Sequence, residues 1–138
     1  MMRNLLALIA GLIVGMAVNM GLIELNTRVL HPLPAGTNAA DPEQFNAYIA
    51  TLPVTGFLVV MLAHLGQAFV GGWTAARLAS SRPMMLAMMI GTLSLMGGIV
   101  MMTIVNPPAW MLVELPLYLI VASIAGRIEQ RRRASAGA

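Results

Sequence analysis

The sequence has no cysteine and no lysine, and it has few charged residues of any kind. The absence of cysteine from its 138 residues excludes disulfide bonds, thiol catalysis and thiolate metal sites. Charged residues make up 9% of the chain, against about 25% in an average soluble domain. This shortage excludes a disordered tail, a coiled coil and an ordinary soluble enzyme of this size.

Hydrophobic residues account for 59% of the chain, and most of them fall in four long runs. The predicted spans are residues 5–25, 53–76, 84–105 and 109–127. At 1.5 Å of rise per residue, each run is about long enough to cross a hydrocarbon core of roughly 30 Å. The sequence therefore predicts one all-α integral membrane domain over residues 1–138, a four-transmembrane-helix antiparallel bundle. The fourth span is the shortest, and we expect it to continue helically into the arginine-rich tail, 128–138.

The arginines predict how the bundle is oriented. Seven of the eight lie before the first span, between the second and third, or after the fourth, and only Arg28 lies on the other side. By the positive-inside rule, both termini should face the cytoplasm of a bacterial inner membrane. The first loop, 26–52, is then on the outer side.

The outer loop contains a short predicted helix. Asp41 is placed to cap the helix, Pro42 suits its first position, and Gln44 is placed to close a capping box. We expect a helix from Pro42 to about Thr51 that lies along the outer membrane surface or covers the bundle.

Small residues recur at helical spacing in every span. Helices in lipid pack closely where such residues let their backbones approach. The candidate packing positions are Gly11, Gly15, Gly71, Gly72, Gly91 and Gly98. Packing within the bundle is the first interpretation, and a homodimer seam along one stripe is the alternative.

Two ionisable residues lie well inside the apolar spans, away from their ends, and such residues are costly in a bilayer unless they serve a purpose. Glu114 lies in the outer half of the fourth span, and His64 lies near the middle of the second. Asn19 is predicted at about the depth of Glu114, with His64 roughly 7 Å deeper. The candidate polar core comprises Glu114, His64, Asn19, Gln67, Tyr118 and Trp110.

Three roles are open for this polar core. A carboxylate beside an imidazole can exchange a proton in a small transporter. It can also bind the polar end of a lipid or quinone. A hydrogen-bonded pair that only fixes helix register is the simplest alternative. Glu24 and Arg28 have the i,i+4 order of a helical ion pair, expected at the membrane interface.

The sequence gives no indication of catalysis, of a cofactor or of a metal. It contains no nucleotide-binding glycine loop, no His-Glu-x-x-His and no nucleophile elbow. Its 13 methionines accompany no histidine pattern and are expected to fill the core or face lipid. Nucleic acid is not an expected partner.

Several segments resemble a family of uncharacterised small bacterial four-helix inner-membrane proteins. They are Glu24, residues 31–36, Asp41-Pro42, residues 49–53, Gly66, residues 71–76, residues 106–110 and Gly126-Arg127. The resemblance implies no activity and carries over no site residue.

Two functions follow as hypotheses. The first is a non-enzymatic structural or interaction protein that packs with itself, as a homo-oligomer, or with a larger membrane partner. The alternative is a small transporter or a lipophilic-ligand binding protein, for a lipid or quinone, that uses Glu114 and His64.

Overall fold

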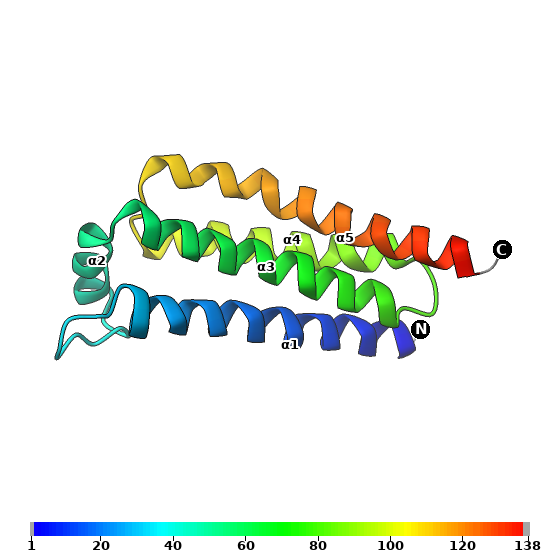
Figure 1. Cartoon of the computed structure of the whole chain (residues 1–138), viewed down its shortest axis with the longest axis horizontal. Coiled ribbons are helices and arrows are strands. Elements are labelled where there is room, and N and C mark those ends of the chain that lie inside the picture. The colour runs from blue at the N-terminus through cyan, green and yellow to red at the C-terminus, as the bar shows by residue number, and fades with distance from the viewer. Residues whose placement is uncertain (1, 137–138) are drawn as a thin grey trace.

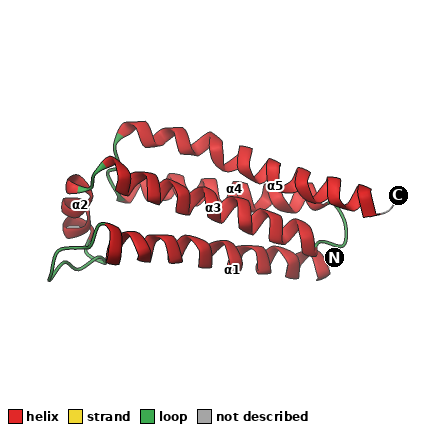
Figure 2. Cartoon of the chain, in the orientation of Figure 1, coloured by secondary structure: helices red, strands yellow, loops and turns green. Residues whose placement is uncertain are grey.

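The computed structural model describes residues 2–136, which form helices joined by loops, with no strand among them (Figure 2). Four of these helices are long and apolar enough to cross a membrane. Helix α1 (Met2–Leu25) runs directly into a π-helical turn (Asn26–Leu30). It is followed by α2 (Pro42–Thr51), α3 (Val54–Leu78) and α4 (Pro83–Ile104). A 3₁₀ segment (Ala109–Val113) then leads into α5 (Glu114–Ala136). The four-helix expectation is confirmed, as is the short helix in the first loop.

The fourth long helix differs from the prediction at its start. The residues from Ala109 to Val113 form a 3₁₀ segment rather than α-helix, and α5 begins at Glu114. Pro116 explains the shift, because proline is tolerated in the first turn of a helix and removes a hydrogen bond from its interior. At the other end α5 continues to Ala136, as expected.

The long helices pack around α3. Helix α1 lies along one side of α3, while α4 and α5 pack on α3 and on each other (Figure 1). Helix α1 barely touches α4. Helix α2 crosses one end of the bundle, and the first and last described residues lie at the other. We call these the α2 end and the arginine end.

Small residues bring α1 and α3 into backbone contact. A Cβ atom at Gly11 would lie 2.6 Å from the carbonyl oxygen of Gly71, and one at Gly15 would lie 2.7 Å from that of Gln67. Neither position can accept a side chain without the helices moving apart. The Gly11–Gly15 stripe is therefore occupied within the chain, and the alternative of a homodimer seam along it has no free surface.

The other glycines named from the sequence pack within the bundle too. Gly72 faces Ala87 and Ala125, and Gly91 faces Ala122. A Cβ atom at Gly98 would lie 2.9 Å from the hydroxyl oxygen of Tyr118. These contacts join α4 to α3 and α5.

The start of α2 matches the prediction in part. The Asp41 side chain accepts hydrogen bonds from the backbone N–H groups of Glu43 and Gln44, as an N-cap does. The expected capping box does not form. The Gln44 amide instead donates to Asp41 Oδ2 and accepts from the backbone N–H of Asn38, because the Asp41 N–H already donates to the Asn38 carbonyl.

Helix α2 is fixed across the end of the bundle by hydrogen bonds on two sides. The Tyr48 hydroxyl donates to the carbonyl of His31, at 2.6 Å. Burial raises the pKa of Tyr48, which keeps this hydroxyl a donor. On the other side, Asn46 donates to the Ile104 carbonyl and accepts from the N–H of Asn106. The helix thus bridges the ends of α1 and α4.

Candidate functional site

A cavity of about 370 Å³ lies beneath α2, between α1, α3, α4 and the start of α5. Its walls are mostly apolar side chains, among them Ile23, Leu52 and Phe57. Tyr48, Ile49 and Leu52 belong to a buried cluster that closes the α2 end. A volume of this size lies within the range of small-molecule sites in proteins.

The cavity reaches the surface of the bundle between α1 and α4. Met20 of α1 is 52% exposed and Met101 of α4 is 45% exposed, and both line the cavity. Gly97, also on the wall, has open space where a Cβ atom would be. The opening exists because α1 packs on α3 and makes almost no contact with α4.

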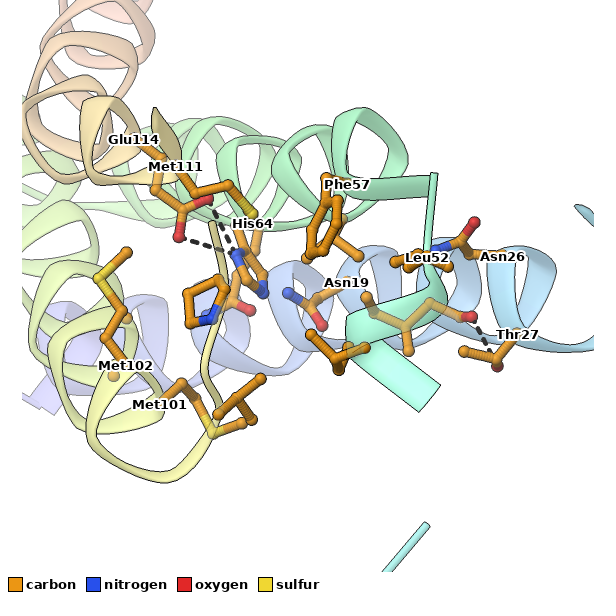
Figure 3. A pocket seen from close by; sticks show the side chains of 18 of the residues that line it. Asn19, Asn26, Thr27, Leu52, Phe57, His64, Met101, Met102, Met111 and Glu114 are labelled. Carbon is orange, nitrogen blue, oxygen red and sulfur yellow. Dashed lines mark hydrogen bonds and ion pairs between the residues drawn. The ribbon is translucent and has the colours of Figure 1, made fainter. Parts of the chain in front are cut away.

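Glu114 and His64 meet at the wall of this cavity (Figure 3). His64 Nδ1 lies 3.2 Å from Glu114 Oε1 and 3.3 Å from Oε2. The Tyr118 hydroxyl donates to Oε1 from 3.3 Å, and its ring stacks on the imidazole. Glu114 is 2% exposed, so its hydrogen bonds with His64 and Tyr118 offset the free-energy cost of burying its carboxyl group.

Two amide side chains from the predicted polar core line the same cavity. Asn19 lies on the opposite side of the imidazole from Glu114 in Figure 3, and its side chain makes no hydrogen bond within residues 2–136. Gln67 donates to the Ser94 hydroxyl from 3.4 Å. Ser94 is buried on α4, and nothing in the sequence beyond its small size marks it as part of this polar core.

Trp110 does not belong to this cluster. It lies in the 3₁₀ segment, where the four-residue spacing to Glu114 does not place both on one helical face. Its ring is 40% exposed and meets Phe57 edge-on, with centroids 6.1 Å apart. The prediction that Trp110 belongs to the polar core is wrong for that reason.

The polar groups at the α2 end of the cavity are all engaged with the protein. Asn26 is 1% exposed and donates to the carbonyl of Gly56. Its Oδ1 lies 2.7 Å from the Nδ1 of His31, whose Nε2 is 3.0 Å from the Thr55 hydroxyl. Thr27 donates to the Ile23 carbonyl. In this network, which the sequence did not predict, His31 joins the first loop to α3.

Two further groups of charges lie away from the cavity. Glu24 and Arg28 form the predicted ion pair, with both side chains exposed. At the arginine end, Glu129 is fully buried and accepts hydrogen bonds from Arg132 and Arg133. Arg133 also donates to the carbonyls of Ala76 and Ala79 at the end of α3. These contacts hold α5 on α3.

Within residues 2–136, no three His, Asp or Glu side chains are grouped so that they could hold a metal ion. Comparisons of the chain with family models, with curated proteins and with solved structures found no match. The resemblance noted in the sequence therefore stays a prediction.

Proposed function

We propose that the protein is a non-enzymatic membrane protein that binds a small lipophilic molecule in the cavity between α1, α3 and α4. The observation that carries this proposal is the cavity itself, which combines apolar walls with a polar group, His64, beside a buried carboxylate. Binding pockets for small molecules have this composition: mostly apolar, with a few placed polar groups.

The opening between α1 and α4 favours a ligand that arrives from the bilayer. Methionine side chains flank the opening on both helices, and these flexible, apolar groups adapt to a lipophilic guest. With the termini in the cytoplasm of a bacterial inner membrane, as the arginines predict, the cavity opens to the outer leaflet. Helix α2 then separates the cavity from water on the outer side.

Packing with a second copy or a larger membrane partner remains a hypothesis with less support. The stripe that motivated it, at Gly11 and Gly15, is used against α3. The exposed apolar side chains of α1 are accounted for by contact with lipid.

Saturable binding of an apolar probe tests the proposal. We suggest tritiated decanophenone, an alkyl phenyl ketone, added to the protein in phosphatidylcholine nanodiscs, with empty nanodiscs correcting for partition into lipid. The proposal predicts a saturable excess of about one probe per chain.

Two glycine variants locate the binding site. Gly97→Leu places a side chain in open space on the cavity wall, and Gly21→Leu does so on α1 away from the cavity. We expect binding to weaken at least about tenfold in Gly97→Leu, since a loss of about 1.4 kcal/mol of binding free energy lowers the affinity tenfold. Binding should stay unchanged in Gly21→Leu. No saturable excess, or equal binding by both variants, would contradict the proposal.

A further inference from the structure

The free nitrogen of His64 faces the cavity. Its Nδ1 is engaged with Glu114, while its Nε2 makes no hydrogen bond among the described residues. Every buried side-chain nitrogen or oxygen atom among the described residues has a hydrogen-bond partner, so an atom without a partner is not buried. His64 itself is only partly buried. The Nε2 atom is therefore accessible, and the cavity is the open space that this side chain lines.

The partner on Nδ1 determines what Nε2 offers. Glu114 is 2% exposed in an apolar span, so a net charge on the Glu114–His64 pair is costly. Two states keep the pair neutral overall: a carboxylate with an imidazolium, or a carboxylic acid with an imidazole that accepts at Nδ1. In both states Nε2 carries the hydrogen, because an imidazolium is protonated on both nitrogens and a neutral imidazole on one.

The surroundings of the pair do not alter this result. The one other side chain that hydrogen-bonds to Glu114 or stacks on His64 in residues 2–136 is that of Tyr118, which is neutral, and no arginine is paired with Glu114 there. Tyr118 donates to the carboxyl group and so leaves Nε2 unaffected. A pair that is neutral overall therefore gives the cavity an N–H donor on an apolar wall, with the Asn19 amide beside it.

We infer that the ligand is a neutral lipophile with a hydrogen-bond acceptor, a carbonyl oxygen, at its polar end, and that His64 Nε2–H donates to that oxygen. The inference rests on the proposed function and specifies its ligand. A cationic head would meet the N–H donor, and an anionic head would give the ligand and the neutral Glu114–His64 pair a net negative charge in an apolar cavity. A neutral carbonyl accepts the hydrogen bond and adds no charge.

A matched pair of probes tests the inference. Decanophenone and decylbenzene have the same shape, but the hydrocarbon has a methylene group in place of the carbonyl. One hydrogen bond contributes about 1 kcal/mol, which corresponds to roughly five- to tenfold in affinity. We expect decanophenone to bind that much more tightly in nanodiscs. His64→Phe should lower decanophenone binding to the level of decylbenzene and leave decylbenzene unchanged.

The protonation of His64 is measured directly on the unaltered chain. The protein has two histidines, so ¹⁵N-histidine NMR with His31→Gln for assignment isolates the His64 signals. We expect a protonated Nε2 whose N–H signal shifts with decanophenone and much less with decylbenzene. An unprotonated Nε2, or equal affinity for the two probes, would overturn the inference while the proposed function stood. Saturable binding of neither probe would overturn the proposed function itself.

Discussion

The two ends of the bundle each contain a buried glutamate on α5, and the two are held in opposite ways. Glu129 is fully buried at the arginine end, where two guanidinium groups hydrogen-bond to its oxygens at 2.6 to 2.8 Å. Glu114 is 2% exposed at the α2 end, where its partners are one imidazole and one phenol at 3.2 to 3.3 Å. The Glu129 carboxylate fixes α5 on α3 through its arginines, whereas Glu114 holds the imidazole of His64, which lines the cavity.

The helices also pack more closely at the arginine end than at the α2 end. At the arginine end, Gly11 and Gly71 bring α1 and α3 together, and Ala7, Leu86 and Ile90 fill the space beside them. At the α2 end, α1 and α4 stand apart and the cavity occupies the space between them. The close packing of α1 on α3 at the arginine end therefore fixes where α1 lies relative to α4 on the two sides of the cavity.

Gly11→Leu should have the largest effect on stability. The new side chain meets the backbone of Gly71 and the side chain of Ala75, so α1 must leave α3. We expect a loss of about 3 kcal/mol in the free energy of unfolding, at the upper end for overpacked sites. Unfolding in mixed dodecyl maltoside and SDS micelles, followed by circular dichroism, measures it. The control, Gly21→Leu, enters open space; a similar loss there would contradict the argument.

Glu129→Gln should have the next largest effect. The amide keeps the shape but removes the charge that Arg132 and Arg133 hold. Breaking a buried ion pair costs 3–5 kcal/mol, but these arginines also contact water, so we expect about 2 kcal/mol in the same assay. Glu24→Gln, which breaks an exposed pair, is the matched control and should cost less than about 1 kcal/mol. Equal losses in the two variants would show that burial of Glu129 adds nothing.

Glu114→Gln should have the smallest effect on stability. The amide can still bond to His64 and Tyr118, and the removed cost of burying a carboxylate offsets the weakened contacts. We expect a change below about 1 kcal/mol. A loss as large as that of Glu129→Gln would assign Glu114 a structural role and favour the interpretation of a pair that only fixes helix register.

The sequence was sufficient for much of the fold, for reasons visible in particular residues. The four apolar runs, the Asp41 cap and the glycine stripes depend on local spacing, which the chain shows directly. The pairing of Glu114 with His64 was within reach too, because depth along a span follows from the rise of a helix.

Other features depend on which helices touch, and local spacing does not contain that information. Trp110 was misplaced because Pro116 moves the start of α5, which turns the preceding residues into a 3₁₀ segment. The cavity arises because α1 packs on α3 rather than on α4, a choice made by Gly11, Gly15 and Gly71 together. The same choice places Ser94 and Gly97 on the cavity wall.

A structure determined in lipid nanodiscs with decanophenone tests the central claim most directly. We predict that α1 and α4 stay apart around Met20 and Met101, and that elongated density fills the space between them. Its polar end should lie within hydrogen-bond distance of His64 Nε2. Helix α1 closed onto α4, with side chains filling the space beside His64, would contradict the account.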